Sequence, residues 1–193
     1  MPAPAQSMIN RSDFVLVVVD VQERLVAAMP ERVRVLEVIS RMLRAASVLG
    51  APIIVTRQYP KGLGDTVPEI EAILLDLADH ESTLIGVDKL AFDCAAESEF
   101  LTALRGTGRR QVVIVGMESH ICVTQSALSL AGLNFQVHIA ADGCCSRDVA
   151  AHRIAMHRLR STGVIVTHSE SVIYEAVGEA GTELFKAILH IVK

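Results

Sequence analysis

The sequence predicts an α/β fold: a doubly wound, six-stranded, mostly parallel sheet with helices on both faces, in a Rossmann-like three-layer sandwich. Six short runs of apolar and β-branched residues recur at intervals of about 25 to 35 residues, and stretches with helical periodicity separate them. The runs lack the polar alternation of a half-exposed sheet, so both faces of the sheet are expected to be covered. A length of 193 residues suits a single domain.

The expected strands and helices alternate along most of the chain. Strands are expected at residues 14–19, 52–56, 83–87, 111–115, 135–140 and 164–167. Helices are expected at residues 31–49, 97–105, 121–131, 148–160, 169–177 and 182–192, with a short one beginning at Pro68. Glycines such as Gly50 and Gly132 close several helices. The common strand order of this fold, 3-2-1-4-5-6, is expected for the sheet.

The N-terminal segment indicates where the domain begins, and the net charge indicates which partners are unfavourable. Residues 1–10 have neither the basic nor the apolar segment of a signal peptide, so a flexible tail is expected there, followed by one domain at 11–193. The net charge of −4 argues against nucleic-acid or anionic membrane partners. No apolar run approaches the ~20 residues that span a bilayer. A small-molecule substrate is the expected partner.

The four cysteines do not form a disulfide framework. Cys94, Cys122, Cys144 and Cys145 show no CxxC spacing, and two of them are adjacent. Free thiols in a reducing cytoplasm are therefore expected. The composition is 51% hydrophobic but only 4% aromatic, which is more aliphatic surface than one small core needs. This excess predicts a buried subunit interface and hence a homo-oligomer.

Three chemically versatile side chains follow strands of the predicted sheet. Asp20 ends the first strand, Lys89 follows the third, and Cys122 follows the fourth. With the expected strand order, the first and fourth strands flank the crevice where such sheets bind ligands. Cys122 would lie in the first turn of a helix, where free N–H groups and the helix dipole favour a thiolate. An acid, an ammonium and a thiol at one edge suggest an activated sulfur nucleophile.

Ordinary structural roles are the alternatives for these residues. Cys122 could be a buried, inert cysteine, Asp20 a residue that caps a turn, and Lys89 an exposed loop cation. Cys144 and Cys145 also precede a predicted helix, so either could be the reactive thiol instead.

His120 offers another possible base, and two other function classes are alternatives for the whole chain. His120, two residues before the cysteine, could serve as a Cys–His base, whereas the other histidines show no paired ligand spacing. A phosphate or nucleotide binder would need a glycine-rich motif after the first strand, where the sequence has Val-Gln-Glu-Arg. A non-catalytic interaction protein with an enzyme's fold stays open.

Several motifs resemble those of the isochorismatase-like cysteine hydrolase superfamily. They are the Asp20-x-Gln22 pair, the lysine after the third strand and the Gly-Met-Glu-Ser-His-Ile-Cys-Val segment at 116–123. The loop 58–64 and the segments 136–138 and 184–186 resemble especially the isochorismatase-domain-containing branch. The resemblance extends over nearly the whole chain, from Asp13 to Lys193.

The resemblance implies an Asp20–Lys89–Cys122 catalytic triad. Cys122 would attack an amide carbonyl and form a thioester, Asp20 would move protons, and Lys89 would keep Asp20 ionised. The peptide bond between Met117 and Glu118 would be cis, and the N–H groups of Glu118 and Cys122 would form the oxyanion hole.

Further expectations concern the substrate pocket, metals and assembly. Gln22, Phe92 and His120 are expected to line the pocket, although His120 stands where amidase members often have an acid. The loop at 57–60 lacks the Asp-x-His cluster of metal-binding nicotinamidases, so neither metal nor other cofactor is expected. A vinyl-ether hydrolase of the isochorismate type is the alternative activity, and such members do not depend on this thiol. Dimers or larger rings are common in the family.

Overall fold

The sheet has the predicted architecture. A computed structural model of the chain describes residues 7–79 and 83–193. Its strands are β1 (Phe14–Val19), β2 (Ile53–Gln58), β3 (Leu84–Lys89), β4 (Gln111–Met117), β5 (Gln136–Cys145) and β6 (Ile165–Thr167). They form one sheet of six strands in the order β3-β2-β1-β4-β5-β6, and neighbouring strands run parallel throughout. The fold class and the strand order are confirmed.

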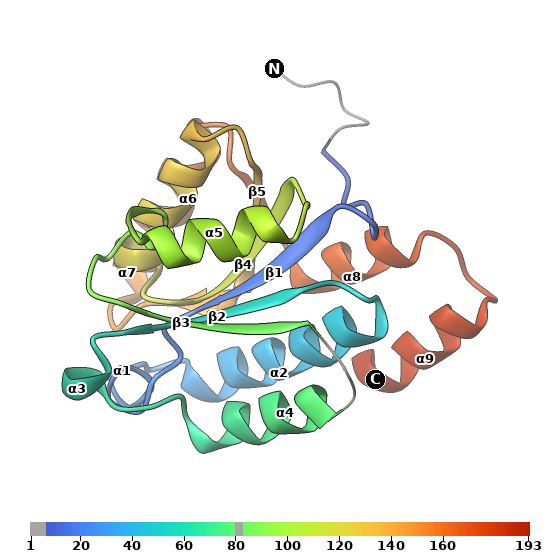
Figure 1. The fold of residues 1–193 in the computed structure, drawn as a ribbon, viewed down its shortest axis with the longest axis horizontal. Helices are drawn as coiled ribbons and strands as arrows, with labels where there is room; N and C mark the ends of the chain where they lie inside the picture. The colour runs from blue at the N-terminus through green and yellow to red at the C-terminus, as the bar shows by residue number, and fades with distance from the viewer. Residues whose placement is uncertain (1–6, 80–82) are drawn as a thin grey trace.

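Helices cover both faces of the sheet (Figure 1). The helices α2 (Arg32–Val48), α4 (Pro68–Asp79), α8 (Ser169–Val177) and α9 (Glu183–Val192) lie on one face. The helices α5 (Ser98–Gly106), α6 (Thr124–Gly132) and α7 (Val149–Ser161) lie on the other. Shorter helical turns are α1 (Glu23–Ala27), α3 (Pro60–Leu63), η2 (Cys94–Ala96) and η3 (Ser119–Val123). No helix in the described ranges is long and apolar enough to cross a membrane.

The position of β1 between two layers of helices explains why its sequence is apolar at every position. Its alternate residues Phe14, Leu16 and Val18 belong to the core beneath α2 and α4, and the residues between them belong to the core beneath α5 and α6. All six residues of β1 are buried. A strand that lies between two helical layers has no solvated face, so it needs no polar alternation.

Several elements extend beyond the predicted bounds or were not predicted. Strand β2 continues to Gln58, β3 to Lys89 and β5 to Cys145, because polar residues near strand ends were assigned to loops. Strand β5 includes Asp142 and Gly143, and its register with β4 shifts between Ile114 and Gly116. The helices α1 and α3 have five and four residues, which is too short for a hydrophobic period to be recognised.

The end of the expected N-terminal tail is held against the domain. The backbone N–H of Ile9 donates to Glu175 Oε2 at 2.8 Å, and that of Asn10 donates to Gln111 Oε1 at 2.7 Å. Ile9 is only 4% exposed. Within the expected tail, Ile9 and Asn10 thus contact the domain, through side chains that are distant in the sequence. Residues 1–6 lie outside the described ranges.

Candidate active site

The carboxyl edge of the sheet brings together the acid, the ammonium and the thiol that the sequence singled out. Asp20 follows β1, Lys89 is the last residue of β3, and Cys122 lies in the turn η3 after β4. Their exposed fractions are 0%, 2% and 5%. Parallel strands end at the same edge of a sheet, which explains how residues about 70 and 30 positions apart in the chain meet.

Asp20 is held by the neighbouring strand β2. Its φ of 54° lies in the left-handed region, which is uncommon for a residue with a side chain. Its backbone N–H donates to the carbonyl of Thr56 at 3.1 Å, and the Thr56 hydroxyl donates to Asp20 Oδ1 at 2.7 Å. One residue of β2 thus fixes both the backbone and the carboxylate of Asp20.

The ammonium of Lys89 is surrounded by oxygen atoms. Its Nζ lies 2.8 Å from Asp20 Oδ2 and donates to Gln58 Oε1 at 2.6 Å. It also donates to the carbonyl groups of Ala91 at 3.2 Å and Phe92 at 3.3 Å. Burial lowers the pKa of Lys89, but the negative charge of Asp20 and the neighbouring thiols raise it, and the net direction is upward. Lys89 is therefore a permanent cation in this site.

The surroundings of Cys122 raise the pKa of its thiol, contrary to the prediction from its place in a helical turn. Burial raises its pKa first, and the charge of Asp20 and a hydrogen bond with Asp20 raise it further. The charge of Lys89 opposes this rise without cancelling it. The prediction failed because the helix dipole is a smaller effect than burial next to a carboxylate, and burial cannot be known from the local sequence. A base is therefore needed to ionise this sulfur, and Asp20 is beside it.

Two buried glutamines support Lys89. The amide of Gln22 accepts from the backbone N–H of Gln58 at 2.7 Å and donates to the carbonyls of Gln58 at 3.0 Å and Gly64 at 2.8 Å. Gln58 in turn donates from Nε2 to the carbonyl of Leu90 at 2.7 Å. Gln22 thus fixes the end of β2, and Gln58 fixes the ammonium.

The turn that carries Cys122 begins where β4 passes very close to β1. Gly116 has a φ of 120°, and a Cβ built on it would lie 2.1 Å from the carbonyl oxygen of Val19. No side chain fits in that space, so this position requires glycine. The peptide bond between Met117 and Glu118 is cis.

Hydrogen bonds join this turn to the segment after β5. They run from Arg147 N to Glu118 Oε2 (2.9 Å), from Ser119 Oγ to Cys145 O (3.0 Å), between Ser119 Oγ and His152 Nδ1 (2.8 Å), and between His120 Nδ1 and Ser146 Oγ (2.9 Å). The Ser119 hydroxyl has one hydrogen and gives it to Cys145, so the His152 ring must donate to Ser119. The turn and that segment are therefore one rigid unit.

The remaining residues predicted for the site differ in their surroundings. Gln22 is fully buried and its amide bonds to backbone groups, so it positions neighbouring elements and presents no surface to a ligand. Phe92 is 53% exposed beside Lys89, and its carbonyl accepts from the ammonium. His120 is half-buried, and its Nδ1 forms a hydrogen bond with the Ser146 hydroxyl.

The other three thiols lie inside the protein. Cys144 and Cys145 end β5 with no exposed surface, and burial raises the pKa of Cys145 to about 12. They precede the helix α7, as predicted, and they belong to the end of β5. Cys94, also unexposed, has its sulfur 4.0 Å from the Thr56 hydroxyl, and burial raises its pKa to about 11.

Sequence reasoning missed Thr56 and Gln58. Both are neutral. Thr56 belongs to no recognised motif, and Gln58 was noted only as the first residue of the loop 58–64. The available signal was their place at the end of the second strand, which the expected order puts next to the strand of Asp20. Within the described ranges, no cluster of three or more His, Cys, Asp or Glu side chains could hold a metal ion.

A family model and curated relatives match most of this chain. Residues 14–171 match the model of the isochorismatase domain. Isochorismatase domain-containing protein 1 of Danio rerio is 38% identical over 179 residues, which are 90% of this chain. The chain spans 59% of the length of that relative and of a similar one from Salmo salar.

Solved structures show the same fold. A Caenorhabditis elegans protein described as MAR1 ribonuclease has a TM-score of 0.84 and 31% identity, and the match covers 96% of this chain and 92% of that one. The YcaC gene product of Escherichia coli, described as an octameric hydrolase of unknown specificity, has a TM-score of 0.81 at 21% identity, with 93% and 85% covered. The family-model match and the similarity to the Danio rerio protein show that this chain belongs to the isochorismatase domain family.

Proposed function

We propose that this protein is a hydrolase that cleaves the C–N bond of a small amide through a thioester on Cys122. The observation that supports the proposal is the buried cluster of Asp20, Lys89 and Cys122 at the carboxyl edge of the sheet. A thiol that rests protonated next to a carboxylate has the arrangement of a nucleophile and its base. The carboxylate is in turn paired with a permanent cation.

The first half of the reaction forms the thioester. Asp20 removes the thiol proton as Cys122 Sγ attacks the carbonyl carbon, and the carbonyl electron pair moves onto its oxygen. The backbone N–H groups of Glu118 and Cys122 donate to that oxygen. As the intermediate collapses, the C–N bond breaks, and the protonated Asp20 gives its proton to the departing amine.

The second half regenerates the enzyme. Asp20 removes a proton from water, the hydroxyl attacks the thioester carbon, and the C–S bond breaks. The proton on Asp20 returns to the sulfur, and the acid product leaves. Lys89 lies 2.8 Å from Asp20 Oδ2, so its positive charge offsets the negative charge of the carboxylate between these steps.

The test is an ammonia-release assay over a panel of small primary amides. Wild-type protein is expected to turn over at least one amide, and Cys122→Ala is expected to lose that turnover with a nearly unchanged thermal midpoint. Cys144→Ala, another buried thiol outside the site, is the matched control and should retain turnover. Retained turnover in Cys122→Ala would exclude the thioester route.

Two further substrates belong in the same panel. A vinyl ether tests the alternative that does not depend on the thiol, and RNA tests the activity that the C. elegans neighbour's name suggests. The amide proposal expects no thiol-dependent cleavage of either one.

A homo-oligomer and a cytoplasmic location also remain proposals. The E. coli neighbour is described as octameric, which supports self-association of this chain. Sedimentation of the purified protein at several concentrations measures the assembly directly.

A further inference from the structure

The strand β3 has an open outer edge. It is the last strand on its side of the sheet and pairs only with β2. The N–H groups of Ile53 and Tyr59 donate to the carbonyls of Thr83 and Lys89, so residues 83, 85, 87 and 89 turn their backbone groups towards β2. The N–H and C=O groups of Leu84, Gly86 and Asp88 therefore point outwards, and no described residue pairs with them.

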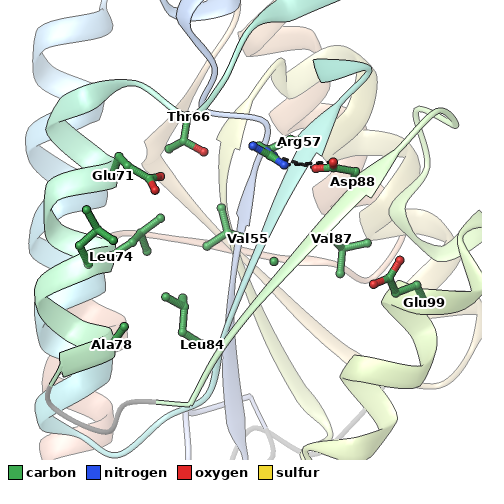
Figure 2. Close-up of a pocket in the computed structure, with 12 residues that line it drawn as sticks. Val55, Arg57, Thr66, Glu71, Leu74, Ala78, Leu84, Val87, Asp88 and Glu99 are labelled. Carbon is green, nitrogen blue, oxygen red and sulfur yellow. Dashed lines mark hydrogen bonds and ion pairs between the residues drawn. The ribbon is translucent and has the colours of Figure 1, made fainter. Parts of the chain in front are cut away.

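A groove of about 420 Å³ follows this edge (Figure 2). Figure 2 shows β3 running through the groove, with Leu74 and Ala78 of α4 on one side and Glu99 of α5 on the other. The apolar part of the lining comes from Val55, Leu74, Leu75, Ala78, Leu84 and Val87. At the centre, Gly86 is exposed, and a Cβ built on it would meet no atom within 4 Å. The edge of the strand is therefore open at Gly86.

The charged rim of the groove is acidic. Three carboxylates line it, those of Glu71, Asp88 and Glu99, and the one guanidinium is that of Arg57. Arg57 is already paired, because it donates to Asp88 at 2.7 and 3.0 Å and to Asp65 at 2.8 Å. Glu71 and Glu99 are exposed, and none of the described ion pairs includes either one. The rim therefore favours a cationic occupant.

We propose that this groove binds an extended, basic segment of a partner protein, which adds to β3 as a further strand. Its backbone would pair with the outward groups of Leu84, Gly86 and Asp88. An apolar residue of the segment would contact Leu74 and Leu84, and lysine or arginine residues on either side would lie near Glu71 and Glu99.

A second copy of this chain fits the groove less well. It would bring an identical rim with the same excess of carboxylates to the same place, and like charges would oppose each other. Edge strands that face solvent in natural proteins usually carry a lysine, a proline or a bulge that prevents pairing. Residues 84–88 of this edge contain none of these, and its one charged residue is bonded to Arg57.

The test uses two labelled peptides, Lys-Val-Leu-Val-Lys and Glu-Val-Leu-Val-Glu, in fluorescence anisotropy titrations of the full chain. The lysine peptide is expected to bind, and its affinity should fall as the salt concentration rises. The glutamate peptide is not expected to bind. Gly86→Pro removes one outward N–H and leaves the hydrogen bonds to β2 in place. The affinity of this variant for the lysine peptide should therefore fall about tenfold. Gly86→Ala keeps that N–H and fits the open space, so it is the matched control and should bind like wild type.

A second variant tests the charge independently of the strand. The double variant Glu71→Lys, Glu99→Lys should reverse the preference and bind the glutamate peptide. Failure of the lysine peptide to bind wild type, or equal affinity for Gly86→Pro and Gly86→Ala, would overturn the proposal. A dimer of this chain would also overturn the proposal if sedimentation showed that Gly86→Pro abolishes it and Gly86→Ala keeps it. That result would mean that a second copy of the chain occupies the edge.

Discussion

The ammonium of Lys89 lies 2.8 Å from Asp20 Oδ2, and neither side chain has any solvent-exposed surface. Burying an ion pair is costly unless further hydrogen bonds satisfy both partners. Here Thr56 donates to the carboxylate, and Gln58 accepts from the ammonium. The pair is therefore maintained by neutral neighbours, and removing any one of them has consequences that can be measured.

Asp20→Asn should separate the reactivity of the thiol from turnover. Burial and the Asp20 charge raise the pKa of Cys122, whereas Lys89 lowers it. Without the carboxylate, the pKa of Cys122 should fall, so iodoacetamide should label the variant at a lower pH than wild type. Amide turnover should nevertheless be lost, because no base remains.

The same substitution leaves Lys89 buried without its counter-charge. A loss of about 3–5 kcal/mol in the free energy of unfolding is expected from urea titration. Asp148→Asn is the control, since Asp148 caps α7 and asparagine caps a helix equally well. An unchanged labelling profile in Asp20→Asn would contradict the proposed contact between acid and thiol.

Gln58→Leu should impair the site without removing a charged group. Lys89 would lose its shortest hydrogen bond, worth about 1.5–3 kcal/mol for a charged donor. We expect kcat to fall about tenfold with KM little changed, because Gln58 is buried behind the site and orients Lys89. The exposed Gln125→Leu is the matched control, and an equal effect of both variants would refute this role.

His138 should make stability depend on pH. It is buried in β5, and burial lowers its pKa to about 4 from the ordinary 6.5. Between these values the unfolded chain binds more protons than the folded one, so stability falls as pH falls from about 6.5 to about 4. The loss is expected to reach about 3 kcal/mol in urea titrations.

A variant isolates this contribution from other acid-sensitive groups. His138→Leu should remove that part of the pH dependence, whereas the exposed His157→Leu should keep it. Parallel pH profiles for wild type and His138→Leu would show that His138 does not contribute.

Gly116→Ala should destabilise the fold at the base of the Cys122 turn. The new methyl group would overlap the carbonyl of Val19, and alanine disfavours a φ of 120°. Overpacking and backbone strain together predict a loss of about 3 kcal/mol in thermal or urea unfolding. Gly132→Ala, where a Cβ meets nothing within 4 Å, should cost nothing. A stable Gly116→Ala protein would contradict the close approach of β4 and β1.

The fold was predictable because several strands and helices each carry the sequence pattern that indicates a parallel sheet. Buried strands such as β1 are apolar at every position, and their alternation with helices restricts the topology to a parallel sheet. Strand ends were not predictable, because Gln58 and Lys89 look like loop residues although they pair with neighbours. Their pairing depends on a strand that is distant in sequence.

The site was predictable only in part, for a related reason. Asp20, Lys89 and Cys122 could be proposed because each is chemically distinctive and follows a strand. Thr56 and Gln58 are neutral, and what distinguishes them is the side chain that each one contacts. The protonated state of Cys122 depends on burial, which only the folded chain reveals.

The hydrogen bonds that tie η3 to the segment after β5 limit how the protein can accommodate ligands of different size. If the proposed reaction takes place at Cys122, this side of the site cannot shift without moving the sulfur itself. Under the proposed function, selection among related amides would therefore fall to other residues, and Tyr59, Leu90 and Phe92 are exposed close to Lys89. Evolution, or an engineer, could exchange those three residues to change selectivity while the chemistry stays intact.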